Sequence, residues 1–255
     1  MTDEVQSVIE MRDIKLKFKG KSVLNGVDIS VKEQETRVIM GVSGCGKSTL
    51  LGILLGLITP DAGTVDFKGQ DMTHLKRRGL NEVRTNIGMV YQNAALLSSL
   101  TIGENVALPL KELTHKNAGE IDSIINEKLE LVGLIDAKDE LPSELSGGMQ
   151  KRAGMARALA LNPELVLFDE PTAGLDPINS NLINELIITL RDSQKVTSII
   201  VTHEMESAFA LATQMSFLDE GRMILACTPE KFRNSEIPIV RKFLSSYSTH
   251  KITEK

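Results

Sequence analysis

The sequence has no long apolar run and only two cysteines. No stretch approaches the roughly 18 uninterrupted apolar residues that indicate a membrane span. The first four residues, MTDE, are acidic where a secretion signal is basic. Cys45 and Cys227 lack the paired spacing of a disulfide framework and are typical of a reducing compartment. We therefore expect a cytoplasmic chain that reaches a membrane only through a partner chain.

An excess of basic charge is also absent. The net charge of −5 and the pI near 5.5 argue against a broad nucleic-acid surface, so no nucleic-acid partner is expected. The basic run Lys76, Arg77 and Arg78 is interpreted as a solvated helix face. With 42% hydrophobic and 25% charged residues, the chain has an ordinary globular composition and can form one domain or a domain with a lobe.

Residues 41–49, GVSGCGKST, match the phosphate-binding pattern G-x-x-x-x-G-K-[ST] at every fixed position. They stand between the apolar runs 36–40 and 50–55, a predicted strand and a predicted helix, which is the context that the pattern requires. Its glycines let the backbone wrap around phosphate oxygens, while Lys47 reaches the β- and γ-phosphates and Ser48 binds Mg²⁺. A glycine turn with an accidental lysine is the weaker interpretation. The predicted nucleotide-binding residues are Gly41, Val42, Ser43, Gly44, Cys45, Gly46, Lys47, Ser48 and Thr49.

The segment before this loop has the pattern of β-strands. Apolar and charged residues alternate over residues 8–19, and further strand-like runs cover 23–29 and 36–40. Phe18 lies just ahead of a glycine turn. It is either a packing residue at the strand end or a stacking platform for adenine, and the composition leaves both interpretations open.

Beyond the loop, predicted strands alternate with helices, which indicates an α/β fold with a mainly parallel sheet. A turn is expected over 59–64, helical character over 93–161 with a helix closed by Gly133, and a further helix around 182–190. The polar tail after Ser245 is expected to fray. The predicted strands cover 65–69, 87–92, 165–168, 198–203, 214–218 and 223–226.

Several of these strands end in polar side chains. The apolar run 165–168 delivers Asp169 and Glu170 to the carboxyl edge of the sheet, where ligands of such sheets bind. Asp169 is placed to hold Mg²⁺ through water, and Glu170 to activate the attacking water. Two acids in a polar loop are the alternative. Gln92 and His203 also end apolar strands, as Asp169 does, so these three side chains are expected to face one phosphate.

A second glycine motif, Ser146, Gly147 and Gly148, opens a predicted helix. A helix N-terminus of this kind is a ready anion site. A plain glycine cap is the alternative, but such caps follow helices rather than precede them.

Together, in this order and spacing, these motifs resemble the ATPase subunit of an ABC transporter over about residues 8–243. The resemblance implies an α/β P-loop NTPase fold: a RecA-like, mainly parallel core, an N-terminal antiparallel β region and a helical subdomain. It implies an ATP-binding domain over residues 1–245, with the helical subdomain at about 93–161, and a polar tail at 246–255.

The same resemblance implies ATP and Mg²⁺ as cofactors and a head-to-tail homodimer that holds two ATP molecules. Phe18 would stack on adenine, and Ser48, Gln92 and Asp169 would serve Mg²⁺. The implied catalytic residues are Glu170, His203 and Gln92. Ser146, Gly147 and Gly148 would complete the ATP site of the opposite subunit, with Asp176 along the seam between the two.

Two features depart from or add to the family pattern. Position 149 is Met where the family commonly has Gln, and Gln150 follows it, so the hydrogen bond credited to that glutamine is missing from this position. Cys45 lies at a helix N-terminus, which lowers a thiol pKa. We therefore expect thiol-reagent sensitivity that bound ATP blocks.

Residues 93–112, Met149 and residues 240–244 are similar to the Mla/Mce-type ATPases of bacterial phospholipid transport. This similarity implies a separate membrane permease, a lipid-binding subunit and a peripheral location on the cytoplasmic face of the inner membrane. The apolar residues Ala95, Leu96 and Leu97 suit docking of the permease. An ABC ATPase for another substrate, a non-transport ABC ATPase and a scaffold without turnover are the alternatives; Glu170 and His203 argue against the scaffold.

Overall fold

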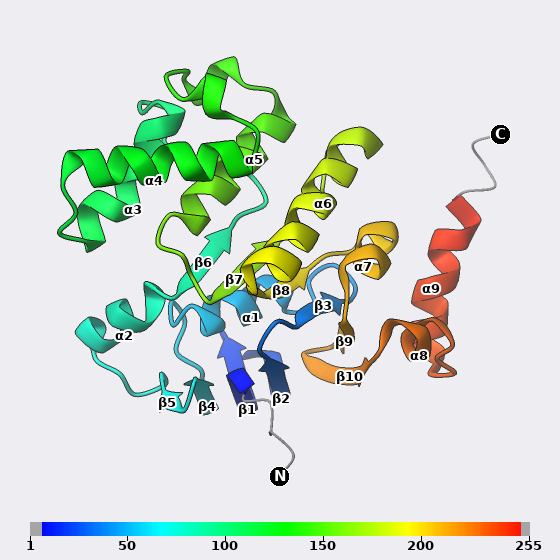
Figure 1. Cartoon of the computed structure of the whole chain (residues 1–255). Helices are drawn as coiled ribbons and strands as arrows, with labels where there is room; N and C mark the ends of the chain where they lie inside the picture. The colour runs from blue at the N-terminus through cyan, green and yellow to red at the C-terminus, as the bar shows by residue number, and fades with distance from the viewer. Residues whose placement is uncertain (1–6, 251–255) are drawn as a thin grey trace, which may run out of the picture. The chain divides into compact units, whose positions relative to one another are not determined.

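The computed structural model describes residues 7–250, with side chains through residue 246, and divides into two compact units. Unit 1 comprises Met1–Leu75 and Ile199–Lys255, and unit 2 comprises Lys76–Ser198 (Figure 1). The chain returns from unit 2 to unit 1 within strand β8 (Thr197–Val201).

Unit 1 begins with a four-stranded antiparallel sheet in the order β2-β1-β4-β5. Its strands are β1 (Ser7–Phe18), β2 (Lys21–Lys32), β4 (Ala62–Phe67) and β5 (Gln70–Asp71). This sheet is the predicted N-terminal β region. The turn predicted over 59–64 is wrong in its second half, because Ala62 already pairs with Lys15 of β1 and thereby extends the ladder.

The rest of unit 1 surrounds the phosphate loop. Strand β9 pairs in parallel with β3 and antiparallel with β10. The fully buried Phe217 and Phe232 belong to the hydrophobic core of this unit. The strands are β3 (Thr36–Met40), β9 (Gln214–Asp219) and β10 (Arg222–Cys227), and the helices are α1 (Lys47–Leu54), α7 (Met205–Leu211), α8 (Pro229–Arg233) and α9 (Pro238–His250). The predicted boundary at residue 245 falls inside α9, and residues 251–255 of the predicted tail lie outside the described residues.

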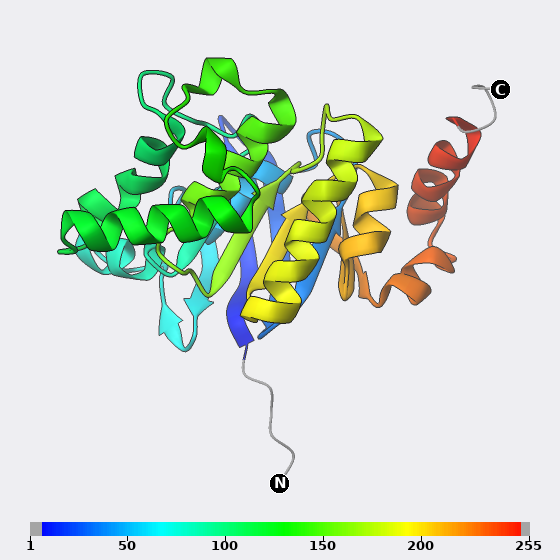
Figure 2. The ribbon, with the colours of Figure 1, turned by 45° about the horizontal axis from the view of Figure 1, so that its top comes forward.

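Unit 2 combines a parallel strand pair with helices, and α4 runs beside α3 and α5 (Figures 1 and 2). Capping boxes at Thr101 and Asn117 start α3 and α4, and Gly133, with φ of 65°, follows the end of α4. Its elements are α2 (Arg77–Arg84), β6 (Ile87–Val90), α3 (Ile102–Leu113), α4 (Ala118–Leu131), η1 (Ile135–Ala137), η2 (Pro142–Glu144), α5 (Gly147–Leu159), β7 (Leu165–Asp169) and α6 (Pro177–Gln194). Helical character throughout 93–161 is therefore wrong for 93–101 and for most of 132–146.

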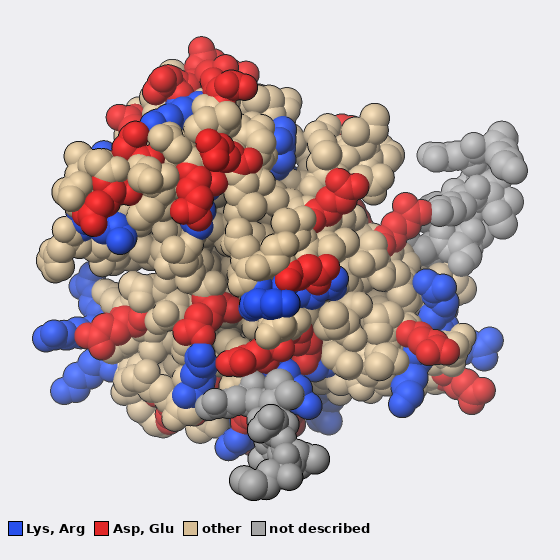
Figure 3. Space-filling view, in the orientation of Figure 1, with Lys and Arg blue, Asp and Glu red and all other residues tan. Residues whose placement is uncertain are grey.

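The surface of unit 2 carries an acidic region and a short basic one (Figure 3). Lys76, Arg77 and Arg78 are exposed at the start of α2, as the sequence predicts. The exposed acidic side chains of α4 and the segment after it are Glu120, Asp122, Glu127, Glu130, Asp136 and Asp139. Within residues 7–250, none of the helices is both long enough and apolar enough to cross a bilayer.

Candidate nucleotide site

The phosphate loop requires glycine at three positions for two different reasons. Gly41, Gly44 and Gly46 have φ of 157°, 80° and 111°. A Cβ on Gly41 would lie 2.1 Å from the carbonyl oxygen of Leu218, and one on Gly46 would lie 2.9 Å from Leu24 Cδ2. A Cβ on Gly44 would meet nothing within 4 Å, so only its dihedral angle calls for glycine there.

The loop ends at the N-terminus of α1, whose first turn has no acidic residue and no side-chain cap. Such a terminus leaves backbone N–H groups and the positive end of the helix dipole available to an anion. Ser43, Gly44 and Ser48 are exposed beside it. The residues therefore fit a phosphate group.

Lys47 lies over the loop. Its Nζ donates to the carbonyl oxygens of Gly41 at 2.7 Å and Val42 at 3.1 Å. These bonds keep the ammonium at the loop rather than in solvent, at the position that the motif predicts for a phosphate ligand.

Cys45 corrects one expectation. Its side chain is only 6% exposed, and burial raises its pKa above the ordinary value, with Lys47 opposing the shift in part. The prediction of a lowered pKa at the helix N-terminus is wrong, because loss of hydration outweighs the nearby positive charge. Both cysteines are free thiols.

Two further predicted residues of unit 1 lie at or just beyond the end of a strand. Phe18 is the last residue of β1 and 49% of the residue is exposed, which favours the stacking interpretation over packing. His203 is exposed and follows β8 by two residues, so the prediction that it ends the strand is wrong. Thr202, whose hydroxyl accepts from Glu204 N–H at 3.0 Å, turns the chain between the strand and α7.

In unit 2, β7 ends at Asp169 as predicted, and both Asp169 and Glu170 are half-buried. Glu170 has φ of 49°, a left-handed conformation that is uncommon for a residue with a Cβ. Lys151 of α5 donates to the carbonyls of the following turn, at 3.0 Å to Pro171 and 2.6 Å to Ala173. Sequence reasoning missed Lys151, although its place on the buried face of α5 was a signal.

The second glycine motif opens α5 as predicted. Ser146 is the N-cap residue, and its hydroxyl accepts from Met149 N–H at 3.4 Å. A Cβ on Gly148 would lie 2.6 Å from Asn179 Oδ1, so a larger residue here would require the Asn179 side chain of α6 to move. Gln150 donates from Nε2 to Pro142 O at 2.9 Å. This amide N–H group is therefore bonded within the chain and does not substitute for the glutamine that the family commonly has at position 149.

Asp176 caps α6 at its exposed N-terminus. Its carboxylate accepts from the N–H groups of Ile178 at 2.9 Å and Asn179 at 3.0 Å. A side-chain hydrogen bond from Asn179, followed by these backbone bonds, holds the pKa of Asp176 below its ordinary value. The carboxylate therefore stays charged at neutral pH.

Gln92 lies two residues beyond β6 and is exposed, so the prediction that it ends the strand is wrong. The chain then turns through Ala94 and Ala95, with φ of 57° and 52°. Arg157 of α5 donates to their carbonyls at 3.0 and 2.7 Å. The fully buried Asn105 holds the next stretch by bonds to Leu97 and to the carbonyls of Leu100 and Thr101. Sequence reasoning missed both Arg157 and Asn105.

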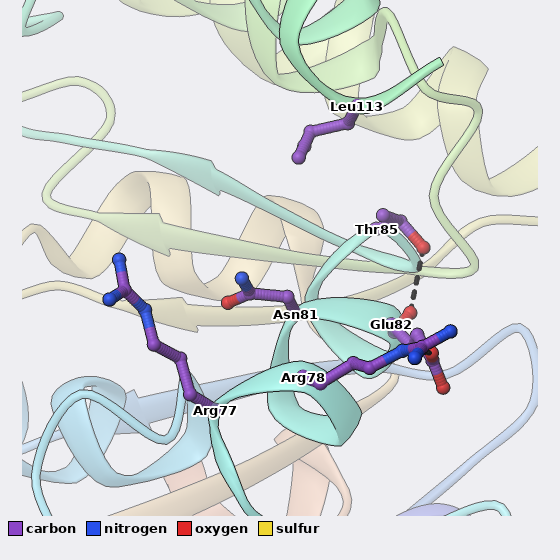
Figure 4. A pocket seen from close by; sticks show the side chains of 6 residues that line it. All are labelled: Arg77, Arg78, Asn81, Glu82, Thr85 and Leu113. Atoms are coloured by element: carbon purple, nitrogen blue, oxygen red, sulfur yellow. Dashed lines mark hydrogen bonds and ion pairs between the residues drawn. The ribbon is translucent and has the colours of Figure 1, made fainter. Parts of the chain in front are cut away.

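An open hollow of about 560 Å³ also lies in unit 2, along α2 (Figure 4). Arg77 and Asn81 project beside it and Leu113 lies above, while Arg78 pairs with Glu82 at 3.4 Å. None of the predicted site residues lines it.

Comparison with known proteins identifies the family. The family model described as ABC transporter matches residues 24–173. The intermembrane phospholipid transport system ATP-binding protein MlaF of Haemophilus influenzae is 39% identical over 95% of this chain and 92% of its own length. The probable ribonucleotide transport ATP-binding protein mkl of Mycobacterium leprae is 37% identical over 93% of this chain and 68% of its own length.

Solved structures agree with the fold. The dimeric ATP-binding cassette MJ0796, in a post-hydrolysis state bound to ADP and Pi, superposes with a TM-score of 0.80 at 31% identity over 87% of this chain and 98% of its own. For cbiO1 from Clostridium perfringens, part of an ABC transporter complex, the TM-score is 0.82 at 26% identity over 95% and 99% of the two chains. The expected α/β P-loop NTPase fold is thereby confirmed. The chain belongs to the ABC transporter family, as one of its ATP-hydrolysing subunits.

Proposed function

We propose that this ATPase powers the transport of phospholipid through a separate membrane permease. The observation that carries the proposal is the similarity to MlaF proteins along nearly their whole length, at 39% identity in Haemophilus influenzae and 35% in Escherichia coli. The mkl relatives favour ribonucleotide as a second candidate substrate, but this chain spans only 68% of the Mycobacterium leprae protein.

The phosphate loop binds the phosphates of ATP in this proposal. Gly41, Gly44 and Gly46 keep the backbone close to the phosphate oxygens, Lys47 contacts the β- and γ-phosphates, and Ser48 is a ligand of Mg²⁺. The uncapped start of α1 and the exposed side of the loop support this assignment. Bound Mg²⁺ would neutralise charge on the phosphate oxygens.

The remaining residues act on the nucleotide and the attacking water. Asp169 and Gln92 bind Mg²⁺, directly or through water, and Glu170 accepts a proton from the attacking water. His203 contacts the γ-phosphate, and Phe18 stacks on adenine. The exposure of Phe18 and His203 supports these roles, because both side chains are available to a ligand.

The working form is a head-to-tail homodimer. Ser146, Gly147 and Gly148 contact the ATP held by the opposite subunit, and Asp176 lies along the seam between the subunits. The dimeric state of the cassette MJ0796 supports this arrangement. The open space around Gly147 leaves room for a phosphate group at the start of α5.

The permease docks beside the Gln92 loop, and the complex lies on the cytoplasmic face of the inner membrane with a lipid-binding subunit. Exposed apolar groups supply this surface, since Leu97 is 45% and Tyr91 39% exposed. Ala95 is exposed as well, and Leu96 is half-buried.

Two measurements test the proposal. ATP hydrolysis by the complex with its native membrane partner is compared between the wild type and Glu170→Gln, where we expect a fall of about 100-fold or more. Equal rates would remove the catalytic assignment of Glu170. Lipid extraction and mass spectrometry of the purified complex should recover bound phospholipid, whereas ribonucleotide without lipid would replace the substrate by the second candidate.

A further inference from the structure

Lys151 is a buried cation in α5, with only 8% of the residue exposed. Its Nζ donates to the carbonyl oxygens of Ala173 at 2.6 Å, Pro171 at 3.0 Å and Glu170 at 3.4 Å. An ammonium group has three N–H donors and no acceptor, so carbonyl oxygens are suitable partners for it. The arrangement compensates the loss of hydration that burial of a charge entails.

The three acceptors belong to the turn that begins at Glu170. Glu170 has φ of 49°, and its carbonyl also accepts from Ala173 N–H at 3.2 Å, which closes the turn. A left-handed conformation is unfavourable for a residue with a Cβ and persists only where surrounding contacts hold it. Lys151 supplies such contacts from outside the turn.

We propose that Lys151 is a positioning residue for ATP hydrolysis: by fixing the carbonyls of residues 170–173, it holds the Glu170 carboxylate where that group activates water. The inference rests on the proposed role of Glu170. Lys151 makes no contact with the nucleotide in this scheme and acts only through the geometry of the turn. Because α5 begins with the motif at Ser146, Lys151 also makes the position of Glu170 dependent on the placement of that motif.

The chain contains a matched control in the same unit. Lys128 of α4 is 2% exposed, and its Nζ donates to Glu127 Oε1 and Asn162 Oδ1, each at 2.6 Å. Replacing either lysine by Met removes a buried ammonium of the same kind. Lys151 donates to the turn that follows Glu170, whereas the bonds of Lys128 go to Glu127 and Asn162.

The experiment measures kcat, KM for Mg-ATP, nucleotide affinity and Tm for the complete complex. For Lys151→Met we expect kcat to fall about 10- to 100-fold, the effect of a small displacement of a catalytic group, with ATP affinity within about twofold of the wild type. Lys151→Arg, which retains charge and several donors, should recover most of kcat. Lys128→Met should lower Tm to a similar extent and leave kcat within about twofold of the wild type.

A double-mutant cycle supplies the second readout. In a Glu170→Gln background, Lys151→Met should cause no further loss of kcat, because the group that it positions is already gone. Equal kcat for Lys151→Met and Lys128→Met, or a full additional loss in the Glu170→Gln background, would overturn the inference. If Lys151→Met does not fold, Lys151→Gln, which keeps two donors, replaces it and should give an intermediate kcat. Equal kcat for the wild type and Glu170→Gln would instead contradict the proposed function.

Discussion

Both units contain loops of the candidate site with left-handed backbone, but the two units stabilise this conformation in different ways. In the phosphate loop of unit 1, the positions with positive φ are Gly41, Gly44 and Gly46, which adopt such angles without a steric penalty. In unit 2, the corresponding positions after Gln92 and Asp169 are Ala94, Ala95 and Glu170. Arg157 and Lys151 of α5 bind the carbonyls at these positions.

The difference shows that a left-handed backbone conformation can be stabilised either by glycine itself or by hydrogen bonds from a distant cation. Glycine makes a turn locally, so the phosphate loop is encoded within its own few residues. In unit 2, cations on one helix hold turns that lie far away in the chain. The loops of unit 2 therefore depend on α5. We expect substitutions of Lys151 or Arg157 in that helix to change the conformation of the distant turns after Asp169 and Gln92.

The largest expected effect is at a glycine of the phosphate loop. Gly41→Ala should destabilise unit 1 by about 2–5 kcal/mol, because the new Cβ would meet the carbonyl oxygen of Leu218. Gly44→Ala, whose Cβ meets nothing within 4 Å, should cost only about 1–2 kcal/mol of backbone strain. Urea unfolding of both variants measures the difference. Equal losses would show that close approach does not decide the glycine at position 41.

Lys47→Ala should lower the ATPase rate about 100-fold, because it removes a charged donor to the phosphates. Nucleotide binding and ATP-driven dimer closure should weaken together. Lys242→Ala, which removes an exposed lysine of α9, is the control and should behave as the wild type. A Lys47→Ala variant that closes normally on ATP yet does not hydrolyse it would contradict the prediction.

Arg157→Met should destabilise unit 2 by about 1–3 kcal/mol, because the carbonyls of Ala94 and Ala95 lose their charged donor. Ala95→Gly should stabilise the protein by about 1 kcal/mol and offset part of that loss, since glycine makes the same turn without Arg157. Thermal unfolding of the two single variants and the double variant tests this. If Ala95→Gly gives no stabilisation in either background, the left-handed angle at Ala95 carries no strain that glycine relieves, and the prediction is contradicted.

The smallest expected effect concerns Cys45. Burial raises the pKa of this thiol, so less thiolate is present at neutral pH than for an exposed cysteine. In a Cys227→Ala variant, alkylation of Cys45 should be slow at pH 7.5 and still increase past pH 9. Rapid labelling at pH 7 would show that the helix N-terminus outweighs burial. Bound ATP should slow the labelling further, and equal rates with and without ATP would contradict its position beside the phosphates.

Local patterns predicted much of both units. The strand β3 over Thr36–Met40, the closure of α4 by Gly133 and the start of α5 at Ser146 follow from residues close together in the sequence. The apolar runs predict strands that end at Gln92 and His203, yet each residue lies two residues beyond its strand. The end of a strand depends on where its neighbour stops pairing, which a single apolar run does not reveal.

Glycine freedom, strand burial and helix capping act over a few residues, so the phosphate-loop pattern, the acid pair after β7 and the cap at Ser146 can be predicted from short stretches of sequence. The bonds from Lys151 and Arg157 to distant carbonyls and the raised pKa of Cys45 follow instead from the packing of segments far apart in the chain. The physical reason is that hydrogen bonding and desolvation of a buried group depend on all the chain segments packed around it.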